Sequence, residues 1–309
     1  MRSKTIKILG YIFTLLAFYY IYLAFNKLNI NWESLISLID RVNILLVILS
    51  FIIYVIVLYM SAVFWSYLVH CFSGDKKGFN RKLIGIYAQS NVGKYLPGNF
   101  MQLIGRNVLA NNLGYKHSTI IMASIYEIGY VLLAGLLVLF MILLFNLSDI
   151  SLQKSLLLSP EKLAITVVIV FSIIAFFVFF FKDKIIDYIN QNEIIPKLKN
   201  TFLLGLGVFI FVYILLAMAN LLLLSIFMDG VSSNDYINIL FVFILSWIVG
   251  FVMPGMPGGI GVREALFIFM LSQKYEIFVV TLIPIIFRLI NILGDVCFFA
   301  LYSIKSKKN

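Results

Sequence analysis

The sequence is poor in charge, cysteine and histidine. Only 12% of its 309 residues are charged, against about 25% in ordinary soluble domains, so a soluble globular fold is excluded. Two cysteines, Cys71 and Cys297, cannot make a disulfide framework, and two histidines offer no metal-binding cluster. The sequence also lacks a nucleophile–base motif, a phosphate-binding P-loop and a dinucleotide fingerprint. We therefore expect no enzyme activity, no metal and no cofactor.

What remains is strongly apolar and basic. Hydrophobic residues make up 62% of the chain, the mean hydropathy is +1.03, and 24 Lys and Arg against 14 Asp and Glu give a net charge of +10. This combination is typical of a polytopic membrane protein whose cations lie in its cytoplasmic loops. Nucleic-acid binding would also use positive charge, but there is no polar domain to present it. We therefore expect an all-α membrane protein and no nucleic acid partner.

Six apolar stretches are long enough to cross a bilayer, which takes about 20 residues. They cover roughly 8–25, 44–69, 118–146, 162–181, 201–228 and 276–304. Two further apolar regions, 83–112 and 237–273, are interrupted by Pro97-Gly98 and by Pro254–Gly259. Proline and glycine end helices, and a broken backbone within a membrane must be buried in protein or line a polar cavity. These regions are predicted to be re-entrant hairpins of two half-helices, although hydropathy alone allows eight full spans.

The distribution of cations gives the expected orientation. With the N-terminus inside, 15 of the 24 Lys and Arg fall on cytoplasmic segments, five on external segments and four in embedded segments. Cytoplasmic loops are enriched in Lys and Arg. The bias therefore predicts a multi-pass protein of the plasma membrane with both termini in the cytoplasm.

The two interrupted regions align without a gap at an offset of 157 residues, which matches Gly93 to Gly250 and Arg106 to Arg263. The same offset lays span 44–69 on 201–226 and span 118–146 on 275–303. The chain is thus predicted to be one transmembrane domain, 1–309, with a helix–hairpin–helix repeat over about 44–146 and again over about 201–303. Three spans separate the hairpins, so the second copy would be inverted, as in many secondary transporters.

Seven ionisable residues fall in or beside the apolar segments, where each is costly and suggests function. They are Lys94, Arg106, Glu127, Arg263, Glu264, Arg288 and Asp295. On the last span Arg288, Asn291 and Asp295 share one helix face, which cannot point at lipid. Glu127, Glu264 and Asp295 are expected to balance or gate the cations. They are alternatively structural partners, as Glu127 with an arginine or Glu264 with Arg288, and Lys94 is alternatively an interfacial lysine.

The arginines indicate an anion site. Guanidinium groups bind phosphate in a bidentate way, and glycine-rich breaks expose backbone N–H groups at half-helix N-termini. The predicted substrate-binding residues are Lys94, Gly98, Arg106, Gly258, Gly259, Arg263 and Arg288. In a bilayer the obvious anionic ligand is a lipid phosphate.

The same residues carry a family resemblance. The run Gly93–Gly98 (GKYLPG), Gly105-Arg106, Glu127, the run Pro257–Ala265 (PGGIGVREA) and Arg288 resemble the lysylphosphatidylglycerol synthase transmembrane-domain family, also called flippase-like. The resemblance covers about residues 10 to 304. The resemblance implies a role in lipid movement, because the lipid-aminoacylating members of this family are taken to have a membrane part that moves the modified lipid between leaflets. In those members a separate cytosolic domain carries out aminoacyl transfer. This sequence ends at Asn309, after the last predicted span, so aminoacyl transfer is not expected. Gln102 stands where many members carry an acidic residue.

The leading hypothesis is a lipid transporter that moves an anionic phospholipid or a polyprenyl-phosphate-linked precursor between leaflets. The alternative is a non-transporting membrane partner that binds or presents lipid to a glycosyltransferase or synthase. The first needs only lipid and membrane as partners, whereas the second also needs an enzyme of lipid or glycan synthesis. Either is compatible with a homo-oligomer.

Overall fold

The computed structural model describes residues 43–74, 80–95, 101–147, 194–227, 233–253, 257–272 and 274–306. Regular structure in these ranges is entirely helical, which confirms the all-α prediction. The elements are α3 (Ile44–Ser73), α4 (Arg81–Asn91), η1 (Val92–Tyr95), α5 (Met101–Asn111), α6 (His117–Leu147), α9 (Ile194–Phe227), α10 (Ser233–Val252), η2 (Pro257–Gly259), α11 (Val262–Leu271) and α12 (Ile277–Ser306). The predicted spans 8–25 and 162–181 and the predicted site residue Gly98 lie outside the described residues.

Four long helices coincide with predicted spans: α3, α6, α9 and α12. Their long apolar runs favour helices because a helix satisfies its backbone hydrogen bonds within the segment. Local signals set the ends of α3: the Asn43 side chain accepts from the Leu45 N–H at 3.1 Å, and Gly74 ends the helix in the left-handed conformation with φ of 72°. Apolar side chains such as Leu45 and Leu203 are 70% and 79% exposed in the described structure, as suits a lipid environment.

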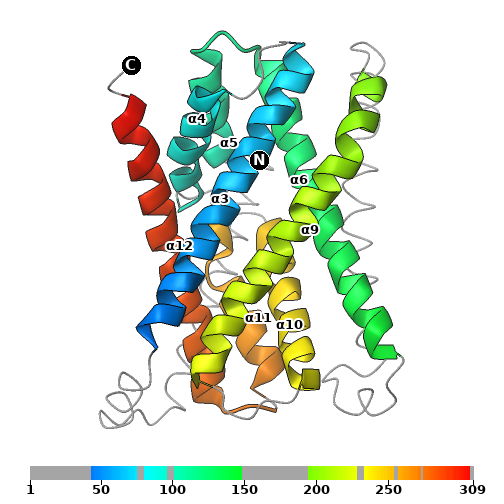
Figure 1. The fold of residues 1–309 in the computed structure, drawn as a ribbon, viewed down its shortest axis with the longest axis vertical. Helices are drawn as coiled ribbons and strands as arrows, with labels where there is room; N and C mark the ends of the chain where they lie inside the picture. Colours follow the sequence, from blue (N-terminus) through cyan, green and yellow to red (C-terminus); the bar gives the residue numbers. More distant parts are fainter. Residues whose placement is uncertain are drawn as a thin grey trace, which may run out of the picture.

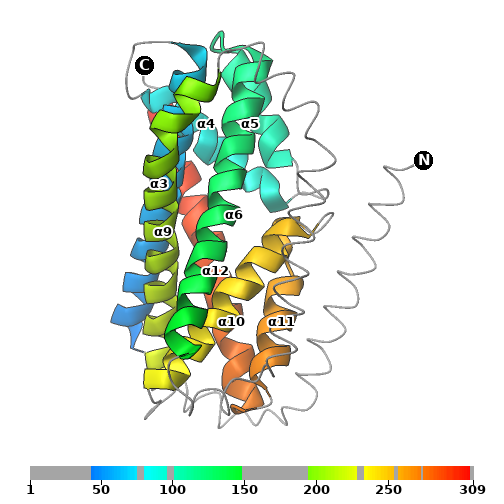
Figure 2. The same cartoon turned by 90° about the vertical axis from the view of Figure 1, so that its right-hand side faces the viewer.

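Both interrupted regions fold as helical hairpins. In the first, α4 and α5 have 11 residues each and pack against each other, and η1 directly follows α4. In the second, α11 has 10 residues but α10 has 20 and is long and apolar enough to cross a membrane. Thus α10 is longer than the predicted half-helix. Figures 1 and 2 place α4 and α5 at one end of the molecule and α10 and α11 at the other, so the hairpins approach each other from opposite ends.

The helices pack in related pairs. Helix α3 packs along α9 at the centre of Figure 1, α4 packs on α12, and α10 packs on α6. Within each half, α5 packs on α6 and α11 on α12, and the tips η1 and η2 meet. Most of these contacts occur in corresponding pairs when α3, α4, α5 and α6 are matched to α9, α10, α11 and α12. The contact of α4 with α12 then corresponds to that of α10 with α6, and the contact of α5 with α6 to that of α11 with α12. The repeat itself and its boundaries stay predictions from the sequence.

Candidate functional site

A cavity of about 120 Å³ lies between the two hairpins, near the contact of η1 with η2. Side chains from both hairpins and from α3, α6, α9 and α12 line it. Its lining includes the four cations that the sequence places in embedded segments: Lys94, Arg106, Arg263 and Arg288. The fold thus brings all four predicted cationic site residues to one internal space, although they are up to 194 positions apart in sequence.

Arg106 and Glu127 form a buried ion pair between α5 and α6. Nη1 of Arg106 donates to Oε2 of Glu127, and the Tyr87 hydroxyl donates to Oε1 at 2.7 Å. The guanidinium also lies over the Tyr87 ring, 3.7 Å from its centroid. Arg106 and Glu127 are only 4% and 5% exposed. The predicted partnership of Glu127 with an arginine is therefore present, and Arg106 is already neutralised by the protein.

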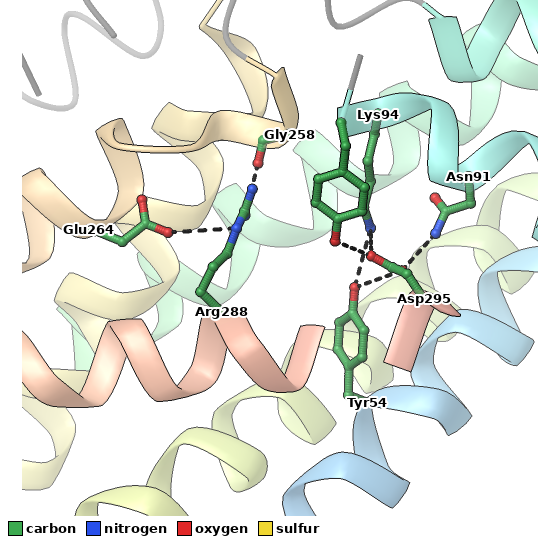
Figure 3. A network of polar contacts seen from close by, with 8 residues as sticks. Tyr54, Asn91, Lys94, Gly258, Glu264, Arg288 and Asp295 are labelled. Atoms are coloured by element: carbon green, nitrogen blue, oxygen red, sulfur yellow. Dashed lines mark hydrogen bonds and ion pairs between the residues drawn. The ribbon is translucent and has the colours of Figure 1, made fainter. Parts of the chain in front are cut away.

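Asp295 lies at the centre of a second cluster, shown in Figure 3. The carboxylate is 1% exposed. It accepts from Asn91 Nδ2 at 2.8 Å, from the Tyr54 hydroxyl at 3.3 Å and from the Tyr95 hydroxyl. Nζ of Lys94 lies 2.7 Å from its Oδ2. These donors come from α3, α4 and η1, so Asp295 ties the tip of the first hairpin to α12.

Two predictions from the sequence can be compared with this cluster. The face of α12 that carries Arg288, Asn291 and Asp295 is turned inward, since Asn291 and Asp295 are 5% and 1% exposed and the Arg288 side chain is 13% exposed. Lys94 points at a buried carboxylate and keeps only 17% of its side chain exposed. The ion pair with Asp295 thus draws the Lys94 ammonium group into the protein.

Arg288 joins α12 to the second hairpin (Figure 3). Its Nη1 donates to the Gly258 carbonyl at 3.1 Å, and its Nε lies 4.0 Å from Oε1 of Glu264. Nε and Nη2 of Arg288 are buried without a hydrogen-bond partner in the described part of the chain. The pairing of Glu264 with Arg288 is thus long and leaves donors unused. Glu264 in turn accepts from the Gly261 N–H at 2.7 Å, so this half-helix N-terminus already holds a carboxylate from its own chain.

Arg263 has no comparable acidic partner. Its guanidinium lies over the Trp247 ring, 4.0 Å from the centroid, and its Nε is buried without a hydrogen-bond partner. Within residues 43–306, as far as the structure describes them, no carboxylate lies within 4.0 Å of it. Its stem crosses Gly250 so closely that a Cβ there would lie 2.3 Å from Cγ of Arg263.

The predicted glycines of the second hairpin fit this packing. Gly258 and Gly259 have φ of 57° and 70°, in the left-handed region that favours glycine. A Cβ on Gly258 would lie 3.2 Å from Nη2 of Arg288, and one on Gly259 would lie 2.8 Å from Nε of Arg263. Two adjacent glycines therefore bring the backbone against both arginines.

Sequence reasoning missed several polar residues of the site: Tyr54, Tyr87, Asn91, Tyr95 and Trp247. Tyr95 follows Lys94 in the first motif, and Asn91 precedes it by three positions, so this neighbourhood could have suggested them. Tyr54, Tyr87 and Trp247 look like ordinary aromatic residues of apolar segments. As for metals, no group of three or more His, Cys, Asp or Glu side chains is placed to hold an ion among the described residues.

These features define a class: an all-helical membrane protein with two opposed hairpins around a charged internal cavity. A family model for the lysylphosphatidylglycerol synthase TM region matches residues 7–297, and the chain belongs to this family. Comparison with curated proteins and with solved structures gave no match.

Proposed function

We propose that this protein binds the head group of an anionic lipid in the cavity between its hairpins and moves that lipid between the leaflets. The observation that carries the proposal is Arg263, a cation that lines the cavity and has no carboxylate partner among the described residues. A buried cation without a counter-ion is unfavourable in a medium of low dielectric constant. An anionic group of a ligand would relieve this cost.

The surroundings of Arg263 support a site for phosphate. Arg288 lines the same cavity and has two buried nitrogen atoms without partners. Guanidinium groups suit the oxygens of a phosphate, which accept several parallel hydrogen bonds. The opposed hairpins around the cavity are also the arrangement in which secondary transporters alternate access to a central site. The proposed setting is the plasma membrane, with both termini in the cytoplasm, as the distribution of cations favours.

The proposal is tested by reconstituting the full chain into liposomes with fluorescent phosphatidylglycerol. The measurement is the fraction of fluorescence that a membrane-impermeant quencher removes, which reports how much labelled lipid reaches the outer leaflet. Wild type is expected to move the lipid. Arg263→Gln is expected to slow movement about tenfold or more, since a charge-assisted contact contributes about 1.5–3 kcal/mol. The matched control is Lys274→Gln, which removes a cation paired with Asp235 outside the cavity.

Equal rates for wild type and Arg263→Gln would refute the proposal. A protein that retains anionic lipid during purification in an Arg263-dependent way, yet moves none, would instead support a partner that presents lipid to an enzyme.

A further inference from the structure

We infer that the cavity selects lipids whose head group carries a single negative charge, as a phosphodiester does, over head groups with a phosphomonoester or a diphosphate. This inference rests on the proposed function and narrows its substrate class. It follows from how the charges around the cavity pair with one another.

Three of the four cavity cations have an acidic neighbour. Arg106 pairs with Glu127, Lys94 with Asp295, and Arg288 lies 4.0 Å from Glu264. Arg263 has no such neighbour in the described ranges, so the group carries one excess positive charge.

Charge balance then sets the preferred ligand. Unit charges a few ångströms apart interact far more strongly in a protein interior than in water. A phosphodiester brings one negative charge and makes the cavity neutral. A phosphomonoester, whose second pKa is about 6, brings nearly two negative charges at pH 8 and leaves one uncompensated. Apart from Arg263, each described cation of the cavity already has a carboxylate within 4.0 Å, so the second charge meets no further unbalanced cation there. These carboxylates are Asp295 for Lys94, Glu127 for Arg106 and Glu264 for Arg288.

The buried guanidinium nitrogens without hydrogen-bond partners also suit a phosphodiester. Arg263 Nε and Arg288 Nε and Nη2 are buried without partners. They lie close to the adjacent residues Gly258 and Gly259, whose added Cβ atoms would meet Nη2 of Arg288 and Nε of Arg263 at 3.2 and 2.8 Å. The two non-bridging oxygens of a phosphodiester can accept from both guanidinium groups. The stem of Arg263 is held against Gly250, which keeps its guanidinium in place.

The test compares fluorescent phosphatidylglycerol, phosphatidate and phosphatidylcholine in liposomes at pH 8. Wild type is expected to move phosphatidylglycerol about tenfold faster than phosphatidate, because the second charge of phosphatidate stays unneutralised in a partly buried site. Glu264→Gln keeps an acceptor for the Gly261 N–H but adds one positive charge to the balance. This variant is expected to shift the preference toward phosphatidate. Asp235→Asn makes the same charge change outside the cavity and is expected to leave the ratio unchanged.

A second variant keeps the inference testable if Glu264→Gln fails to fold. Arg263→Gln makes the balance neutral, so the preference for phosphatidylglycerol over phosphatidylcholine is expected to disappear. If wild type moves phosphatidate as fast as phosphatidylglycerol, and Arg263→Gln slows both, the inference is overturned and the proposed function stands. If no anionic lipid moves and Arg263→Gln changes nothing, the proposed function and the inference both fail.

Discussion

Arg106 and Arg263 match at the 157-residue sequence offset, yet in the described part of the chain only Arg106 has a carboxylate within 4.0 Å. Glu127 lies on α6 and pairs with Arg106. The position that corresponds to Glu127 in the second half is Pro284, on α12. Pro284 and Arg263 line the same small cleft between α10, α11 and α12. Arg106 is thus neutralised by a carboxylate, whereas Arg263 has none within 4.0 Å among the described residues.

This asymmetry predicts the effect of restoring the missing acid. Pro284→Glu is expected to place a carboxylate near Arg263, cancel the excess charge and reduce transport of anionic lipid about as strongly as Arg263→Gln. Pro284→Gln is the control, because it removes the proline in the same way without adding charge. Transport in liposomes is the measurement. Full transport by Pro284→Glu, with the protein folded, would contradict the assignment of Arg263 as the anion-binding cation.

The Arg106–Glu127 pair is expected to act mainly on stability. Removing one partner strands a buried charge, so Glu127→Ala should lower the free energy of unfolding by about 3–5 kcal/mol. The double variant Arg106→Ala with Glu127→Ala should be less destabilised than the sum of the two single variants. Unfolding in detergent measures the cycle.

The Lys274–Asp235 pair provides the comparison for this cycle. Its side chains are 32% and 22% exposed, and Asp235→Asn should cost no more than about 1 kcal/mol. Strict additivity of the Arg106 and Glu127 variants would show that the two residues do not depend on each other.

Much of the fold could be predicted from the sequence because its signals are local. Apolar length marks α3, α6, α9 and α12, and Pro-Gly breaks mark the hairpins. The length of α10 was not predicted. The break at Pro254 indicates where the apolar run ends, but it does not indicate how many residues before it form a single helix. Helix α9 likewise begins at Ile194, seven residues before the predicted span.

The site could be predicted in its charged members but not in its pairings. A charge in an apolar segment must find a partner or a cavity, so Arg106, Arg263 and Asp295 stand out in the sequence. Which acid meets which cation depends on helix packing across the two halves, as for Lys94 and Asp295, which are 201 positions apart. Tyrosines such as Tyr54 donate to this cluster but look in sequence like any aromatic residue of a span.

The Lys94–Asp295 pair is expected to hold the tip of the first hairpin against α12. Asp295→Asn removes the carboxylate charge and leaves the Lys94 ammonium without a counter-ion, so the tip should detach more often. The measurement is the rate at which a water-soluble maleimide modifies Gln102→Cys, at a cavity-lining position, in a background without Cys71 and Cys297. An increase of about tenfold is expected, which corresponds to about 1.4 kcal/mol.

Restoring neutrality tests whether charge is the cause. Adding Lys94→Gln to Asp295→Asn removes the stranded cation, and the labelling rate is expected to return toward that of the unaltered pair. A labelling rate that Asp295→Asn leaves unchanged would show that the pair does not hold the tip.

The last prediction concerns how Arg263 is positioned. A Cβ at Gly250 would lie 2.3 Å from Cγ and 2.9 Å from Nε of Arg263, so Gly250→Ala must displace that side chain. The variant is expected to bind and move phosphatidylglycerol about tenfold less well, because the loss of a positioned charge-assisted contact amounts to about 1.5–3 kcal/mol.

Gly207→Ala in α9 is the matched control, since no atom lies within 4 Å of the Cβ it would add. It should leave transport unchanged and stabilise the helix slightly, because alanine favours helices more than glycine does. Equal transport by the two alanine variants would mean that the position of the Arg263 side chain does not matter to the ligand.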